Sequence, residues 1–284
     1  MDAVFAKSKA IADTIEGMLS PFSMAAMDSL LALQAERNTC GDMVEMGVYR
    51  GKSAAILSGR LSKGEALHLY DVADYFDRDA LGRTGAELLF NIKNTLDLSK
   101  SHFRDRRSRV RFCHVDASHM FEPTLHEMEL ANHMLSEDGI LCMDDYTNLN
   151  YSQILAATFK YLFTRRTDLT IFMVTDEKAY LCRRKCFPVY AGFILNSILS
   201  QMDDRGVGDA CIARTDDTPS YGAFYLRTKN EGEVDNFYGA GIYSDFYRIR
   251  DHSTLAGPTA AAKRVVRRVI GRADAWLKFR STTS

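Results

Sequence analysis

Three acidic residues stand directly after runs of apolar residues. Asp116 follows the run 110–115, and the adjacent Asp144 and Asp145 follow the run 140–143. Continuous apolar runs of this length, flanked by helical patterns, predict buried strands of a parallel sheet. Ligands of such sheets bind outside the carboxyl ends of the strands. We therefore expect the three carboxylates to converge at one edge, where they suit a hard divalent cation with oxygen ligands.

A glycine turn lies between the first predicted strand, 42–47, and the helix that follows it. Gly47 and Gly51 allow the backbone to turn tightly and to approach a ligand without a Cβ atom in the way. Lys52 and Ser53 begin the helix, whose free amide groups favour a negatively charged or carboxylate group. The turn therefore predicts a ligand-binding loop.

Acids flank this turn. Glu45 lies near the end of the first strand, where an unpaired carboxylate is costly unless it has a cationic or hydrogen-bonding partner. Asp71 ends the second predicted strand, where an acid in a doubly wound sheet usually accepts hydrogen bonds from ribose hydroxyls. Asp74 and Asp77 are nearby alternatives. The turn is not the dinucleotide motif GxGxxG, because Tyr49 replaces a glycine, and its glycines are one residue too close for a P-loop.

The remaining pattern predicts the elements that position these residues. Two amphipathic helices are expected over 3–37, with a break before Pro21, because proline suits a first helical turn. Strands then alternate with helices over 42–164, which predicts an α/β fold with a doubly wound, mostly parallel sheet. The runs 169–174 and 178–182 are separated by a hairpin-sized gap, so we expect the last strand to be an antiparallel edge strand.

No third strand is evident after Asp71. Residues 77–105 are expected to be polar and largely helical, so either 101–104 forms a degenerate strand or the sheet lacks one. A helix is expected over 190–202, and 223–226 is a short β-like run.

The chain divides into three predicted parts. Residues 1–38 form amino-terminal helices, 39–185 the sheet domain, and 186–284 a carboxyl-terminal α+β appendage packed on it. Within the appendage, 258–280 is predicted to be a basic amphipathic helix, either docked by its apolar face or in contact with a membrane surface or partner. The appendage also carries aromatic residues that pack its core, line a binding site or form a dimer interface: Tyr221, Phe224, Tyr225, Phe237, Tyr238 and Tyr243.

The composition is that of an ordinary globular protein, with 46% apolar and 26% charged residues and a formal net charge of -1. No overall field favours nucleic acid, and no stretch approaches the roughly 18 apolar residues of a membrane span. The amino terminus lacks the pattern of a signal peptide. The six cysteines have no CxxC spacing, which predicts reduced thiols in a cytoplasmic protein rather than a zinc site. The amino-terminal helices offer faces through which a homo-oligomer can form.

Taken together, these motifs resemble those of one family. The motif Glu-x-Gly-x-x-x-Gly at 45–51, Asp71 at the end of the second strand, and the Asp-Asp pair after Gly-Ile-Leu-x-Met resemble class I S-adenosylmethionine-dependent methyltransferases. More narrowly they resemble metal-dependent O-methyltransferases, which include catechol-type enzymes, macrocin O-methyltransferase-like sugar enzymes and relatives of cephalosporin hydroxylase. The resemblance covers 40–183 and implies a Rossmann-like methyltransferase fold.

The resemblance implies a role for each motif. It implies that S-adenosylmethionine is bound by residues of the turn and the second strand: Glu45, Gly47, Tyr49, Gly51, Ser53 and Asp71. Within this set, Glu45 would lie near the amino group of the methionine part, and Asp71 would hold the ribose hydroxyls. It implies Asp116, Asp144 and Asp145 as ligands of Mg²⁺ or another divalent cation. Adenine contacts normally follow the third strand, so they are not assigned.

Catalytic roles are implied for His119 and Asp116. Catechol-type enzymes have a lysine general base at the position of His119, and a histidine can do the same with a pKa closer to neutrality. His119 can instead be a capping or packing group. His114 points to the same face of its strand as Asp116, so it either packs or supports the ligand from behind. Tyr146 is expected to shape the acceptor pocket.

The expected activity is therefore methylation of a hydroxyl group on a small molecule, with S-adenosylmethionine and a divalent cation. An aspartate at the last ligand position, Asp145, is typical of the sugar-modifying branch, which favours a sugar or natural-product acceptor. The alternatives are a metal-dependent hydroxylase or hydrolase that uses the same acids, and a non-catalytic binding protein. The glycine turn with Glu45 and Asp71 favours the methyltransferase.

Overall fold

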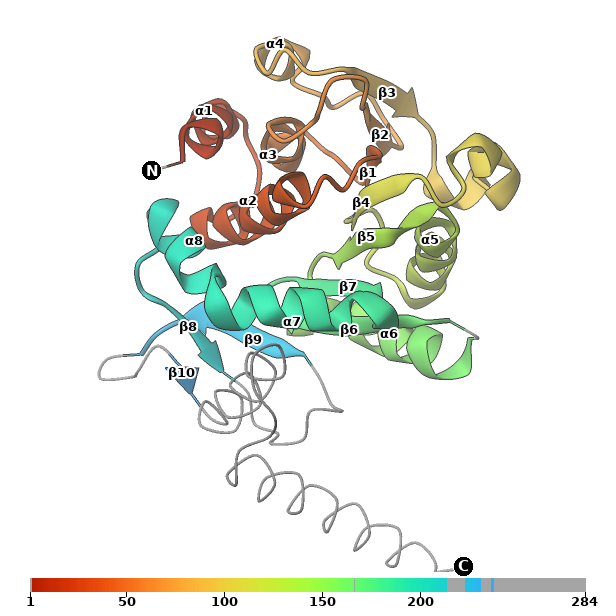
Figure 1. Cartoon of the computed structure of the whole chain (residues 1–284). Helices are drawn as coiled ribbons and strands as arrows, with labels where there is room; N and C mark the ends of the chain where they lie inside the picture. The colour runs from red at the N-terminus through yellow and green to blue at the C-terminus, as the bar shows by residue number, and fades with distance from the viewer. Residues whose placement is uncertain (1, 166, 214–222, 231–235, 238–284) are drawn as a thin grey trace, which may run out of the picture. The chain divides into compact units, whose positions relative to one another are not determined.

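The computed structural model describes residues 2–165, 167–213, 223–230 and 236–237. These residues form one ten-stranded sheet with helices on both faces, in the strand order β10-β8-β9-β6-β7-β5-β4-β1-β2-β3 (Figure 1). The predictions made for the basic helix at 258–280, and for Tyr221, Tyr238 and Tyr243, lie outside the described residues.

The predicted break between the two amino-terminal helices is confirmed. Helix α1 spans Ala3–Ala12 and α2 spans Pro21–Glu36. Ser20 caps α2, because its hydroxyl accepts a hydrogen bond from the Ser23 amide at 3.1 Å, and Pro21 occupies the first helical position. The α2 helix is buried over most of its length.

The parallel part of the sheet is confirmed by five strands. They are β1 (Asp42–Met46), β2 (Leu67–Asp71), β3 (Leu88–Ile92), β4 (Val110–Val115) and β5 (Leu135–Met143). The β1 strand pairs in parallel with β2 on one side and β4 on the other, so the order reverses between β1 and β4. In doubly wound sheets, ligands bind at such a switch point, outside the carboxyl ends of the strands.

Helices cover both faces of this sheet (Figure 1). Two pack together on one face: α5 (Phe121–Met134) and α6 (Ser152–Thr164). On the other face, α1, α2 and α3 (Lys52–Ser58) contact one another, and α8 (Ile198–Asp204) contacts α2 and α7 (Phe187–Asn196). The shorter α4 (Arg78–Gly82) contacts α1. No helix among the described residues is long and apolar enough to cross a membrane.

The expectation that no ordinary third strand follows Asp71 is wrong. Residues 88–92 form β3, paired in parallel with β2, whereas 101–104 lie in a 3₁₀ helix, η2 (Lys100–Arg106). The β3 strand is an edge strand, and Leu89 and Ile92 remain exposed. A half-exposed edge strand does not show the continuous apolar run that identifies a buried one.

The predicted antiparallel strand is confirmed, but it is not at the edge. The β7 strand (Ala179–Arg183) lies between β5 and β6 (Leu169–Val174) and is antiparallel to both. Beyond β6 the sheet continues with β9 (Phe224–Thr228), β8 (Ala210–Ala213) and β10 (Asn236–Phe237). Residues 210–213, 224–228 and 236–237 therefore extend the same sheet.

Candidate active site

The carboxyl ends of β1, β2 and β4 enclose a cavity of about 420 Å³. This volume lies in the ordinary range for a site that binds a cofactor or small molecule. Four residues predicted for the site line the cavity: Gly47, Tyr49, Asp71 and Asp116. The structure thus brings the glycine turn, the acid of the second strand and the first acid of the predicted metal site together.

Gly47 is required by the close approach of β1 to the chain after β4. Its φ is +80°, and a Cβ atom there would lie 2.1 Å from the carbonyl oxygen of Asp116. Gly51 also has a left-handed φ, +96°, but it precedes α3 and faces the side chain of Leu81 rather than the cavity. Ser53 lies in the first turn of α3 and does not line the cavity either.

Asp71 holds the glycine turn in place. Its Oδ2 accepts hydrogen bonds from the amides of Val48 and Tyr49, both at 2.8 Å. Tyr49 has a φ of +50°, a left-handed conformation that costs a residue with a side chain on the order of 1 kcal/mol or more. The two hydrogen bonds to Asp71 stabilise this strained turn.

Glu45 lies behind the cavity and is fully buried. Its Oε1 is 2.7 Å from Nδ1 of His114, so His114 supplies a partner for this carboxylate, whereas its Oε2 has no hydrogen-bond partner among the described residues. A buried carboxylate oxygen without a partner is energetically costly. Such an atom is typical of a functional site.

The predicted acids lie close together at this edge. The amide of Asp116 donates to Met46 at 2.8 Å, and that of Asp144 donates to Val115 at 2.9 Å, so both acids continue the sheet pairing. The backbone at Asp145 then adopts a left-handed conformation, with a φ of +50°. Two groups of three residues have potential ligand atoms within 4.8 Å of one another. The first group is His114, Asp116 and Asp144, and the second is Asp116, His119 and Asp145.

A buried lysine that the sequence did not reveal completes the site. Lys178 directly precedes β7, is 1% exposed, and forms an ion pair with Oδ2 of Asp144. Its Nζ is also 3.4 Å from Nε2 of His114. The pairing of β5 with β7 explains why Lys178 reaches the site. Met143 pairs with Ala179 in these antiparallel strands, so the next residues, 144 and 178, lie close together.

The surroundings of His114 favour its charged form. Burial and the neighbouring Lys178 ammonium oppose protonation, but hydrogen bonds to Asp144 and Glu45 outweigh them and raise the His114 pKa to about 9. Burial also opposes the charged forms of Asp144 and Lys178, yet their mutual attraction dominates. It lowers the pKa of Asp144 well below its usual range and raises that of Lys178.

Two further acids have raised pKa values. Burial and the charge of Asp144 raise the pKa of Asp116 to about 6. Glu127 on α5 is fully buried, and burial raises its pKa to about 7 although the hydroxyl of Thr95 donates to it at 2.6 Å. The hydrogen bond to Asp116 raises the pKa of His119. Perturbed groups beside a cavity are typical of an active site.

The cavity wall also includes residues that could not be assigned without β3. Lys93, Asn94, Thr95 and Leu96 follow this strand and line the cavity. Asn94 caps the short helix η1 (Thr95–Asp97), because its side chain accepts from the amide of Leu96 at 3.0 Å.

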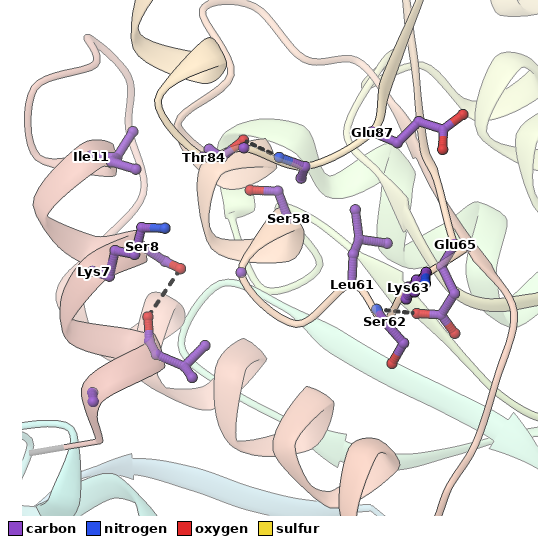
Figure 2. A pocket seen from close by; sticks show the side chains of 16 residues that line it. Lys7, Ser8, Ile11, Ser58, Leu61, Ser62, Lys63, Glu65, Thr84 and Glu87 are labelled. Atoms are coloured by element: carbon purple, nitrogen blue, oxygen red, sulfur yellow. Dashed lines mark hydrogen bonds between the residues drawn. The ribbon is translucent and has the colours of Figure 1, made fainter.

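A larger cavity of about 540 Å³ lies at the opposite end of the strands (Figure 2). Lys7 and Ser8 of α1, Ser58 of α3, and Glu65 and Glu87 before β2 and β3 contribute to its wall. Among the residues that the structure describes, no group of three potential metal ligands lies here. Because ligands of parallel sheets bind at the carboxyl ends of the strands, the smaller cavity is the candidate active site.

Comparisons with known proteins agree with this fold. Residues 44–146 match a family described as "Methyltransferase domain". The structure of cofactor-bound Rv0187 from MTB is 14% identical, with a TM-score of 0.50, over 65% of this chain and 91% of that chain. A Klebsiella pneumoniae chain is 12% identical, with a TM-score of 0.50, over 64% of this chain and 90% of that chain.

An O-methyltransferase from Bacillus cereus in complex with SAH is also similar. It is 14% identical, with a TM-score of 0.48, over 64% of this chain and 90% of that chain. No curated protein sequence matches the chain. At these identities the solved structures show the fold alone. The family match over residues 44–146 and the similar solved structures agree with a Rossmann-like methyltransferase fold.

Proposed function

We propose that the protein is an S-adenosylmethionine-dependent O-methyltransferase that uses a divalent cation. The observation that carries this proposal is the union of two half-sites at one edge of the sheet. The cavity beside the glycine turn forms one half, and the group of Asp116, His119 and Asp145 forms the other. Asp116 belongs to both, so a methyl donor and a metal-bound acceptor would meet there.

The cavity fits the methyl donor. Gly47 permits the close approach of the chain segments that follow β1 and β4, and both segments line the cavity. Asp71 commits its Oδ2 to the turn. Within the described part of the chain, its Oδ1 has only a 3.5 Å contact with the amide of Ala73, so this oxygen is available to ribose hydroxyls. Lys93, Asn94 and Leu96 are the candidates for the adenine end of the cavity.

The acidic group fits a divalent cation. Carboxylates and an imidazole are ligands that such cations accept, and Asp116, His119 and Asp145 are each only partly buried, so water and an acceptor have access. The ligand set predicted from the sequence is Asp116, Asp144 and Asp145. When bound, S-adenosylmethionine supplies the methyl group, and the cation lowers the pKa of the acceptor hydroxyl.

The residues of the chain orient the reaction and hold its protons. Nε2 of His119 lies 3.4 Å from Oδ1 of Asp116 and 3.3 Å from Oδ2 of Asp145, so without a cation the imidazole bridges the two carboxylates. The ring of Tyr151 lies over His119, with centroids 4.1 Å apart, and limits its rotation. Tyr146 is buried in the hydrophobic core, with its ring centroid 6.5 Å from that of Phe159, so its role in shaping the acceptor pocket stays a prediction.

The acceptor is proposed to be a small molecule with a hydroxyl group next to a second oxygen, such as a sugar or natural-product intermediate. Two adjacent oxygens would chelate the cation and leave one hydroxyl in line with the methyl donor, where orientation supplies much of the rate. A cytoplasmic location and a homo-oligomer are part of the same proposal.

Calorimetric titration with S-adenosylmethionine and S-adenosylhomocysteine, with and without Mg²⁺ or Mn²⁺, tests the proposal. We expect binding of both ligands at micromolar concentrations in either buffer, because the cavity is separate from most of the acidic group. Failure of both to bind at millimolar concentration would overturn the methyltransferase assignment.

A further inference from the structure

The two acids of the Asp144–Asp145 pair have different surroundings. Asp144 has no free carboxylate oxygen: Oδ1 accepts from the amide of Asp145 at 2.8 Å, and Oδ2 is paired with the Lys178 ammonium. The imidazole of His114 lies 3.4 Å from the same Oδ2. Because Lys178 is 1% exposed and Asp144 is its only acidic partner among the described residues, a cation that took Oδ2 would leave a buried ammonium unpaired.

Asp145 instead faces His119. Its Oδ1 accepts from the side-chain amide of Asn148 at 2.9 Å, which fixes the carboxylate, and its Oδ2 lies 3.3 Å from Nε2 of His119. Oδ1 of Asp116 lies 3.4 Å from the same nitrogen. Octahedral coordination at about 2.1 Å puts neighbouring ligand atoms about 3 Å apart, so these three atoms need to move little to enclose one cation.

We propose that the divalent cation is bound by Asp116, His119 and Asp145, and that Lys178 keeps Asp144 out of the coordination shell. This inference rests on the proposed metal dependence and changes its predicted ligand set. His119 is then a ligand rather than the general base. A nitrogen ligand must be deprotonated, so His119 would bind the cation through an unprotonated Nε2.

The ligand set has a consequence for metal choice. An imidazole ligand is better suited to transition metals than to Mg²⁺, which prefers oxygen ligands. The site should therefore bind Mn²⁺ more tightly than Mg²⁺, and the preference should depend on His119. Lys178 meanwhile supplies a permanent positive charge to Asp144 with or without the metal.

Titration of the full chain with Mn²⁺, followed by electron paramagnetic resonance, tests the inference. The first variant is His119→Phe, which keeps a ring against Tyr151 and removes the nitrogen ligand. The second is the double variant Asp144→Asn/Lys178→Gln, which removes both charges of the buried pair without leaving either unpaired. Circular dichroism and binding of S-adenosylhomocysteine confirm that each variant is folded.

We expect His119→Phe to bind Mn²⁺ at least tenfold more weakly and to lose the nitrogen modulation that an imidazole ligand gives in pulsed spectra. The double variant should alter Mn²⁺ affinity by less than about threefold. Retained affinity in His119→Phe, together with a large loss in the double variant, would overturn the inference but leave the proposed function standing. A wild-type chain that binds S-adenosylhomocysteine but no Mn²⁺ would remove the metal dependence and this inference with it.

Discussion

Two clusters of buried charged residues lie at opposite ends of the parallel strands, and they are built differently. The amino-end cluster consists of Gln34, Glu65 and Arg111. The carboxyl-end cluster consists of Glu45, His114, Asp144 and Lys178. Both clusters contain charges removed from water, so both require internal partners. Within the described part of the chain, only the amino-end cluster provides a partner for every charged atom.

The amino-end cluster is fully hydrogen-bonded. The guanidinium of Arg111 donates to both carboxylate oxygens of Glu65, to Gln34 and to the carbonyl of Arg60. Glu65 also accepts from the amides of Gly41 and Ser62, each at 2.8 Å. Although burial opposes its charge, Arg111 and these amides lower the Glu65 pKa.

The carboxyl-end cluster instead keeps costly features. Oε2 of Glu45 has no partner among the residues described, and Asp116 beside the cluster has a raised pKa. Unpaired polar atoms of this kind persist where the surrounding structure imposes them, and they are typical of functional sites. Both ends bury charged groups, so burial does not distinguish the structural end from the reactive end. The difference is whether every buried charged atom has a hydrogen-bond partner.

The largest effect on stability is expected at the amino-end cluster. Arg111→Met leaves the Glu65 carboxylate buried without its cation and should lower the free energy of unfolding by about 3–5 kcal/mol. Urea denaturation measures this loss. The matched double variant Arg111→Met/Glu65→Gln should recover part of it, because it removes the unpaired charge and keeps a side-chain oxygen that can accept from the Gly41 or Ser62 amide. A loss below about 1 kcal/mol for the single variant would show that this cluster is not structural in the sense proposed.

The second largest effect is expected for a substitution that weakens cofactor binding at the carboxyl end of the strands. Asp71→Ala removes the acceptor for the amides of Val48 and Tyr49, so the turn loses its preorganised shape. We expect S-adenosylhomocysteine to bind about 30- to 150-fold more weakly by calorimetry, which corresponds to about 2–3 kcal/mol. Asp74→Ala is the control, because Asp74 is exposed and its ion-pair partner in the described structure is Arg78. Equal losses in both variants would contradict the role of Asp71.

Much of this arrangement could be predicted from the sequence, because buried parallel strands leave long apolar runs. The ends of β1, β2, β4 and β5 were predicted within a few residues, and the acids that follow them lie at one edge as expected. The need of Glu45 for a partner also follows from its place in a buried strand, and His114 meets that need.

Other parts could not be predicted, for physical reasons. Residues 88–92 form an edge strand whose side chains are only partly covered, so its pattern is not that of a buried strand. Lys178 lies among charged residues between two apolar runs, which is the pattern of a solvent-facing turn. Its burial depends on Asp144, which is distant in the sequence. The partners of a buried charge therefore emerge only from the fold.

Replacement of Glu127 is expected to stabilise the protein, whereas replacement of Arg111 destabilises it. Its pKa is about 7 in the folded protein, above the ordinary value of 4.5, so the folded state holds this proton more tightly than the unfolded state. Stability should therefore fall as the pH rises from about 4.5 to 7. Glu127→Gln should remove this decline and raise the free energy of unfolding at pH 8 by about 2 kcal/mol. A variant that is less stable than wild type at pH 8 would contradict this account of Glu127.

The smallest expected effect is at Asp116. In metal-free buffer at pH 8, Asp116→Asn should raise the free energy of unfolding by about 1 kcal/mol, because it removes the repulsion from Asp144 and the site is partly screened by water. The same variant should lose Mn²⁺ binding. Thermal unfolding in the presence of a chelator measures the first effect. A large decrease in the free energy of unfolding would instead show that Asp116 stabilises the fold, as Glu65 and Arg111 do.

The central claim is that the carboxyl end of the sheet is the active edge, although the larger cavity lies at the other end. A crystal structure of the wild-type chain with S-adenosylhomocysteine and Mn²⁺, with anomalous data at the manganese edge, tests it directly. We predict S-adenosylhomocysteine in the cavity lined by Gly47, Tyr49 and Asp71, and one anomalous peak between Asp116 and Asp145. S-adenosylhomocysteine in the amino-end cavity of Figure 2, or manganese away from these acids, would contradict the claim.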